Sequence, residues 1–131
     1  DVNVRRAVLT ALLPCDDAFG MHLAQMDALR ALFVALNDES LEVRKLAIAL
    51  TGKLAPRNPA YVLPALRRHL LMLLTELEHG AESQLREESA VLLGCLIAAC
   101  NQLVQPYVSP ILRQVVVRLR EAEHLDAAGA G

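Results

Sequence analysis

Apolar residues recur along this chain at the three- and four-residue spacing of amphipathic helices. Leu29, Leu32, Phe33 and Leu36, for example, fall at positions i, i+3, i+4 and i+7 of one helical face. The run from Leu70 to Leu74 is apolar all round its helix, so we expect it to be enclosed on more than one side. The pattern predicts an all-α fold of about six helices, at residues 1–13, 21–36, 41–55, 59–79, 82–100 and 105–121.

Two sequence patterns occur more than once. Residues 59–67 and 106–113 each contain two prolines and a tyrosine, and both end in Pro-x-Leu-Arg. A second pattern places a glycine eight residues after an arginine, and Arg5 begins a shorter copy of it. A repeat of about 40 residues indicates a helical solenoid, in which each unit buries its apolar face against its neighbours.

These patterns divide the chain into units. We expect a half-repeat at 1–14, repeats at 20–55 and 58–100, a half-repeat at 105–122, and a flexible tail or linker at 123–131. The proline pattern marks the first helix of a unit and the arginine–glycine pattern marks the second. The structural repeat positions are therefore Pro59, Pro64, Pro106 and Pro110 in first helices, and Arg5, Arg44, Arg86, Gly52 and Gly94 in second helices.

Each class of repeat position has a predicted structural role. The glycines should let a facing helix approach closely, and Pro64 should kink its helix. Asn58 should cap the helix that begins at Pro59. The arginines should bridge to an acidic group or a loop carbonyl of the next unit, and the alternative is a ladder of cations for an acidic ligand. Candidate partners for these bridges are Asp1, Asp38 and Glu82.

Composition narrows the functions that the chain can have. Its 131 residues are 54% hydrophobic but only 3% aromatic, which is typical of packed helices filled with Leu, Val and Ala. The formal net charge of −2 gives no field that would recruit nucleic acid or an anionic membrane, and we interpret residues 67–69 as a solvated basic helix face. No apolar run is long enough to span a bilayer. We interpret the cysteines as reduced core residues of an intracellular protein: Cys15, Cys95 and Cys100.

Motifs for catalysis and metal binding are missing from the sequence. The six glycines form neither a dinucleotide-binding nor a Walker pattern, and no kinase HRD or DFG triplet occurs. The four histidines do not form an H-E-x-x-H motif or pair with C-x-x-C. We therefore predict no catalytic, cofactor-binding or metal-binding residue in this segment.

Several stretches resemble known families. Asp38, followed five residues later by Val43-Arg44, resembles the second helix of a HEAT repeat, and the Pro-x-Leu-Arg segments resemble its first helix. Longer runs are similar to the amino-terminal HEAT region of the target of rapamycin (TOR) Ser/Thr protein kinases. These runs are residues 22–25, 32–39, 42–48, 58–62, 74–79 and 105–112, and the Ala/Glu-rich sequence after residue 120 departs from the family.

The resemblance implies both a fold and a role. The fold would be a right-handed α-α superhelix of the HEAT/armadillo type. The role would be a scaffold segment of a nutrient-responsive, cytoplasmic Ser/Thr kinase that docks TOR complex subunits and supports self-dimerisation. ATP and Mg would be used by the parent kinase, not by this segment, and endomembrane association would come through partners. The alternatives are a HEAT adaptor without a kinase, such as a transport receptor or phosphatase scaffold, and a nucleic-acid-associated HEAT protein, which the balanced charge disfavours.

Overall fold

The protein is built from helices joined by short loops. The structure, a computed structural model, describes the backbone of residues 1–130 and the side chains of residues 1–121. It contains no strand over this backbone range. The helices are α1 (Val2–Leu12), α2 (Asp17–Leu23), α3 (Met26–Ala35), α4 (Leu41–Leu54), α5 (Pro59–His79), α6 (Ser83–Ala99), α7 (Asn101–Val104) and α8 (Val108–Ala130), with 3-10 turns η1 (Ala55–Arg57) and η2 (Gln105–Tyr107).

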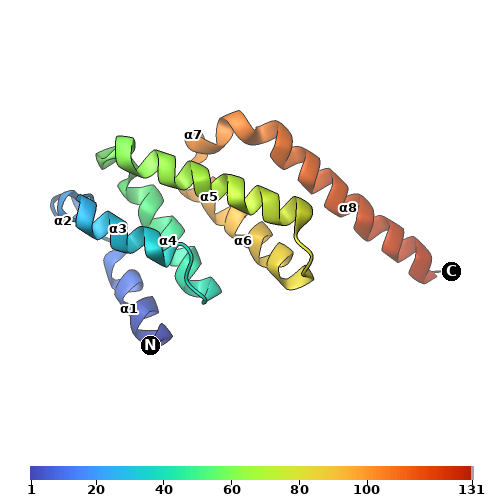
Figure 1. Cartoon of the computed structure of the whole chain (residues 1–131), viewed down its shortest axis with the longest axis horizontal. Helices are drawn as coiled ribbons and strands as arrows, with labels where there is room; N and C mark the ends of the chain where they lie inside the picture. Colours follow the sequence, from blue (N-terminus) through green and yellow to red (C-terminus); the bar gives the residue numbers. More distant parts are fainter. Residues whose placement is uncertain (131) are drawn as a thin grey trace.

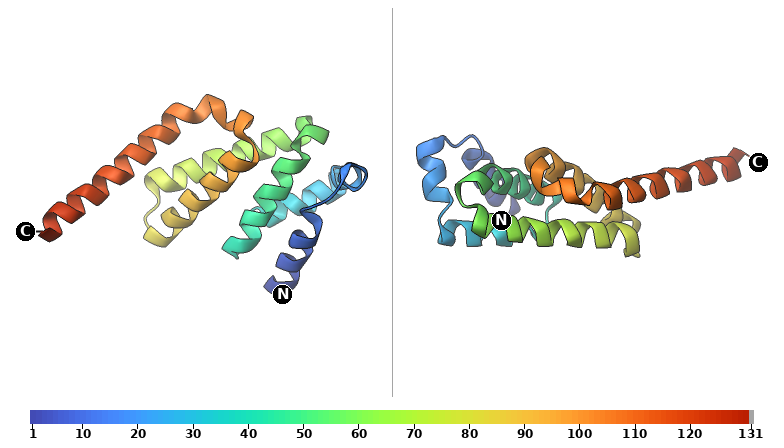
Figure 2. Two further views of the ribbon diagram at one scale, coloured as in Figure 1. Left: turned by 180° about the vertical axis from the view of Figure 1, so that it is seen from behind. Right: turned by 90° about the horizontal axis from the view of Figure 1, so that it is seen from above.

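The helices stack in two layers. In one layer α4 lies between α1 and α6, and in the other α5 contacts α3 on one side and α8 on the other. Figure 1 shows this order, with the two termini at opposite ends of the molecule, and the right view of Figure 2 shows the layers edge-on. The short α4–α5 and α5–α6 connections make these helices antiparallel neighbours. The predicted all-α helical solenoid is therefore confirmed.

Three helix boundaries differ from those predicted. The single helix expected at 21–36 is two helices, α2 and α3, separated at Ala24 and Gln25. The helix expected to begin at residue 105 begins instead at Val108, after the turn η2, because a proline within the turn cannot donate a backbone hydrogen bond. At its other end, α8 continues through Ala130. The flexibility expected of 123–131 stays a prediction, and residue 131 lies outside the described residues.

Asn58 explains the break between α2 and α3. Its side chain was expected to cap α5, but the structure shows no side-chain cap there. Instead, Asn58 Nδ2 donates a hydrogen bond of 2.9 Å to the backbone oxygen of Ala24, the C-cap residue of α2. The carbonyl at the end of α2 is thus satisfied by a side chain of the next unit. The kink predicted at Pro64 stays a prediction.

The hydrophobic core runs continuously between the two layers. It is aliphatic: the largest fully buried side chains are Leu29, Ile48, Leu50, Leu54, Leu66, Leu70, Leu92, Leu96, Val43 and Val62, together with Thr51. On α5, Leu70 is 0% exposed, but Leu71 is 45% and Met72 is 47% exposed. The expectation that residues 70–74 are enclosed on more than one side is therefore wrong, because only one layer of helices covers α5.

The terminal helices leave apolar side chains exposed. Val4 and Val8 on α1 are 58% and 50% exposed, and Leu112 and Leu119 on α8 are 55% and 63% exposed. Since solenoid ends need a polar cap to stay monomeric, we expect the isolated chain to self-associate at concentrations on the order of tens of micromolar. Sedimentation velocity measures this directly. A stable monomer in that range would contradict the expectation.

Candidate functional site: a groove between successive units

Two of the three repeated arginines join successive units. Arg5 Nε donates a hydrogen bond of 2.7 Å to Asp38 Oδ2, and Arg44 Nη2 donates one of 2.8 Å to Glu88 Oε2. These bonds hold the pKa values of Asp38 and Glu88 below their ordinary values. Arg86, by contrast, donates only to Ser83 Oγ in its own helix among the described side chains, at 3.4 Å. The predicted bridges thus form at Arg5 and Arg44, and Asp38 is the one candidate partner that takes part.

Other bridges between units were missed by the sequence interpretation. Lys53 Nζ donates to the backbone oxygen of Leu13 at 2.7 Å, and Arg57 pairs with Asp17. At the other end, Arg118 Nη2 donates to the carbonyl of Glu78 at 3.2 Å, near the end of α5. These basic residues do not recur at the repeat spacing, so the sequence contained no periodic signal for them.

The repeated glycines do not share one environment. A Cβ atom built on Gly52 of α4 would lie 2.7 Å from Ala99 Cβ and 2.9 Å from the Ala99 backbone oxygen in α6. The close approach predicted at Gly52 is confirmed. A Cβ on Gly94 of α6 would meet no atom within 4 Å among the described residues. The packing role predicted for Gly94 is therefore wrong here, because α6 has α4 on one side and no described helix against this position.

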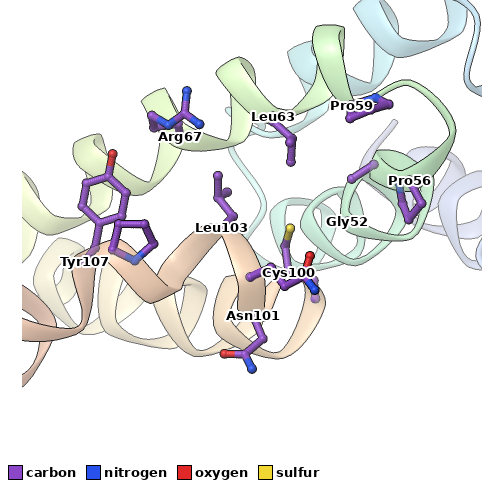
Figure 3. A pocket seen from close by; sticks show the side chains of 13 residues that line it. Gly52, Pro56, Pro59, Leu63, Arg67, Cys100, Asn101, Leu103 and Tyr107 are labelled. Carbon is purple, nitrogen blue, oxygen red and sulfur yellow. The ribbon is translucent and has the colours of Figure 1, made fainter.

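An apolar groove opens beside this contact. It has a volume of about 620 Å³ and lies between the starts of two units. Its floor is Gly52, Ala99 and Cys100. One wall is the first half of α5, and the opposite wall comes from α7 and η2. In Figure 3, Pro56 and Pro59 lie at one end of the groove and Arg67 and Tyr107 at the other, with Leu63, Leu103 and the Cys100 sulfur between them.

Helix periodicity sets the length of the groove. Pro59, Leu63 and Arg67 are spaced by four residues, so they follow one face of α5 over about 12 Å at 1.5 Å per residue. Tyr107 faces this row from η2, and Pro106 of the same turn also lines the groove. The groove therefore gathers three predicted repeat positions: Gly52, Pro59 and Pro106. The others lie outside its lining: Pro64, Pro110, Gly94, Arg5, Arg44 and Arg86.

The lining of the groove has one charged residue. That residue is Arg67, which is exposed and forms no ion pair with the side chains of residues 1–121. Its neighbour Arg68 is also exposed but does not line the groove. The sequence interpretation treated residues 67–69 as one solvated face, which is wrong for His69 because its side chain is only 5% exposed. The structure separates Arg67 from Arg68, because only Arg67 follows Pro59 and Leu63 at helical spacing along the wall of the groove.

A second, smaller cavity contains a buried histidine. The cavity has a volume of about 210 Å³ and is lined by residues that include Arg44, His69, Glu76 and Ser89. His69 is 5% exposed, and its Nε2 has no hydrogen-bond partner in the structure. Burial lowers the pKa of His69, and the positive charge of Arg44 lowers it further. The folded protein therefore favours the neutral imidazole.

We expect His69 to make stability fall in mild acid. Its pKa is lowered by folding, so the unfolded chain binds more protons once the pH drops below about 6.5. The free energy of unfolding should decrease by up to about 1.4 kcal/mol per pH unit in this window, and level off below the folded pKa. Urea unfolding between about pH 7.5 and 5 measures the slope. The His69→Gln variant should lose it and the exposed-site variant His79→Gln should keep it; equal slopes would contradict the assignment.

Among residues 1–121, neither cavity is accompanied by a cluster of potential metal ligands. No group of three or more His, Cys, Asp or Glu side chains could hold a metal ion in this part of the chain. Over the same residues no single helix is long and apolar enough to cross a membrane. Only α6 taken together with residues 101–121 is long and apolar enough, and that pair is bent by 117°.

Comparison with known proteins finds relatives that match nearly the whole chain. No protein-family model matches the chain. The serine/threonine-protein kinase TOR of Arabidopsis thaliana is 51% identical over 127 residues, which is 97% of this chain and 5% of the relative. The corresponding rice protein (Oryza sativa subsp. japonica) is 52% identical over 130 residues, 99% of this chain and 5% of the relative. The chain is homologous to a segment of the TOR kinases.

The likeness extends beyond plants. Serine/threonine-protein kinase tor1 of Schizosaccharomyces pombe is 40% identical over 116 residues, covering 88% of this chain and 5% of the relative. The resemblance to TOR kinases inferred from short runs is therefore confirmed over nearly the whole chain. The chain spans about one twentieth of the length of these TOR relatives. The alternative of an adaptor without a kinase is not favoured, because each of these relatives is a kinase by name.

Proposed function

We propose that the chain is a HEAT-repeat scaffold segment of a TOR-like Ser/Thr protein kinase. The observation that carries this proposal is homology over 97% and 99% of the chain to two TOR kinases, of which it makes up 5%. The stacked hairpins support the HEAT assignment. The sequence lacks phosphate-binding and kinase motifs, so phosphoryl transfer belongs to another part of the parent protein, which would use ATP and Mg.

The local task of the segment in this proposal is protein docking. Solenoids present an extended surface on a row of stacked helices, and this surface suits large protein partners. The partners would be subunits of a TOR complex, such as TORC1, and a second copy of the parent kinase. The protein would work in the cytoplasm and reach endomembranes through those partners. A role in nutrient-dependent control of growth follows from the same family assignment.

The encoding transcript and its product test this proposal. We expect the reading frame to continue after residue 131 into a Ser/Thr protein kinase domain with lysine-bearing kinase motifs. The purified parent protein should phosphorylate Ser/Thr peptides with ATP and Mg, whereas the 131-residue chain alone should not. A stop codon shortly after residue 131, or phosphoryl transfer by the isolated chain, would contradict the proposal.

A further inference from the structure

The groove between the units combines an apolar lining with a single cation at one end. Its lining residues include no Asp or Glu, and the charged one is Arg67. Other basic side chains that bridge the units are occupied: Arg5 and Arg44 bind carboxylates, and Lys53 and Arg118 bind backbone carbonyls. Arg67 has no such role within residues 1–121. Its guanidinium is thus available to a ligand.

The electrostatic potential at the other end of the groove is also positive. The helix α5 starts there with Pro59 at its first position and without a side-chain cap from Asn58. The positive end of the helix dipole therefore lies at this end of the wall, where its effect is confined to the first turn of α5. No lining carboxylate offsets it. This field favours an acidic ligand over a basic one.

The dimensions of the groove fit a short extended peptide. The wall from Pro59 to Arg67 is about 12 Å long, and alternate side chains of a strand-like peptide are about 6.6 Å apart. Three side chains on one face of such a peptide, at positions 1, 3 and 5, therefore span about 13 Å. The first would lie beside Pro59, the second would contact Leu63 and Leu103 in the middle of the groove, and the third would reach Arg67.

We propose that this groove binds a short extended segment of a partner protein with the pattern apolar-x-apolar-x-acidic. The first apolar side chain lies beside Pro59, the second lies over Cys100 between Leu63 and Leu103, and the carboxylate pairs with Arg67. This mode resembles other grooves in which alternate side chains of an extended peptide give specificity. A nucleic acid fits poorly, since one cation and one tyrosine cannot follow a phosphate backbone. The inference rests on the proposed docking function only in that the occupant is a protein.

Fluorescence anisotropy with labelled peptides tests the proposal. The probes are Leu-Ser-Leu-Ser-Asp, its reversed sequence, and Leu-Ser-Leu-Ser-Lys as the charge control. We expect the 131-residue chain to bind one aspartate probe saturably and at least about tenfold more tightly than the lysine probe. Arg67→Glu should remove this preference. Arg68→Glu, which makes the same charge change at an exposed site outside the groove, should keep it.

A labelling experiment locates the bound peptide. Cys100 lies in the groove, whereas Cys15 lines a different cavity. The aspartate probe should slow the reaction of Cys100 with N-ethylmaleimide several-fold and leave that of Cys15 unchanged. The proposal is overturned if neither aspartate probe binds at about 1 mM, if Arg67→Glu and Arg68→Glu behave alike, or if bound peptide leaves Cys100 unprotected. None of these results would alter the test of the parent kinase, which depends on the transcript and on phosphoryl transfer.

Discussion

Gly52→Leu should destabilise the protein by about 2 kcal/mol or more, despite the better helix propensity of leucine. Even a Cβ atom at this position would lie 2.7 Å from Ala99 Cβ and 2.9 Å from the Ala99 backbone oxygen. The backbone oxygen of Ala99, the last residue of α6, cannot rotate away as a flexible side chain can, so α4 and the end of α6 would have to separate. Urea or thermal unfolding followed by circular dichroism measures the loss.

Gly94→Leu is the matched control for this prediction. Gly94 occupies the equivalent repeat position on α6, but the space beside it is open among the described residues. Replacing a glycine inside a helix should therefore leave stability unchanged or raise it by up to about 1 kcal/mol. Equal destabilisation by the two substitutions would show that the helix contact at Gly52 is wrongly placed.

Leu70→Ala should cost about 2–5 kcal/mol, whereas Leu71→Ala should cost less than about 1 kcal/mol. Leu70 is 0% exposed in the core between the layers, and Leu71, on the next position of α5, is 45% exposed. Truncation of Leu70 removes apolar contacts and leaves a cavity, but Leu71 has little buried area to lose. Chemical unfolding of both variants measures the difference.

The Leu70 and Leu71 pair tests the orientation of α5. If α5 were covered on a second side in the isolated chain, as the apolar run from Leu70 to Leu74 first suggested, Leu71→Ala would be costly as well. Comparable losses of stability at the two sites would therefore contradict the two-layer arrangement.

The sequence predicts those parts of the fold that depend on local patterns. The bounds of α5 and α6 follow from Pro59 at a helix start, Gly80 at a helix end and the continuous helical periodicity between them. The break between α2 and α3 does not follow, because it is stabilised by Asn58 from the next unit. A contact between residues 34 positions apart has no signature in the local pattern.

In the candidate site, too, some features follow from local sequence patterns and others depend on long-range contacts. Gly52, Pro59 and Pro106 were found as repeat positions, and all three line the groove. Their joint location was not predicted, because it depends on how closely α4 and α6 approach and on where η2 turns. Arg67 looked like part of a basic cluster with Arg68, and only the three-dimensional arrangement places it at the end of the groove. Gly94 shows the opposite error. It occupies the same repeat position as Gly52, but it does not make the same close helix contact.

The central claim is that the units stack through close contact of α4 with α6, which forms the floor of the groove. A double-mutant cycle of Gly52→Ala and Ala99→Gly tests this contact most directly. Removing Ala99 Cβ relieves its clash with the new Cβ at position 52, so Gly52→Ala should cost less in the Ala99→Gly background, by about 0.5 kcal/mol or more. Additive effects within about 0.3 kcal/mol would show that the Cβ atoms at positions 52 and 99 do not meet, and would contradict the claim.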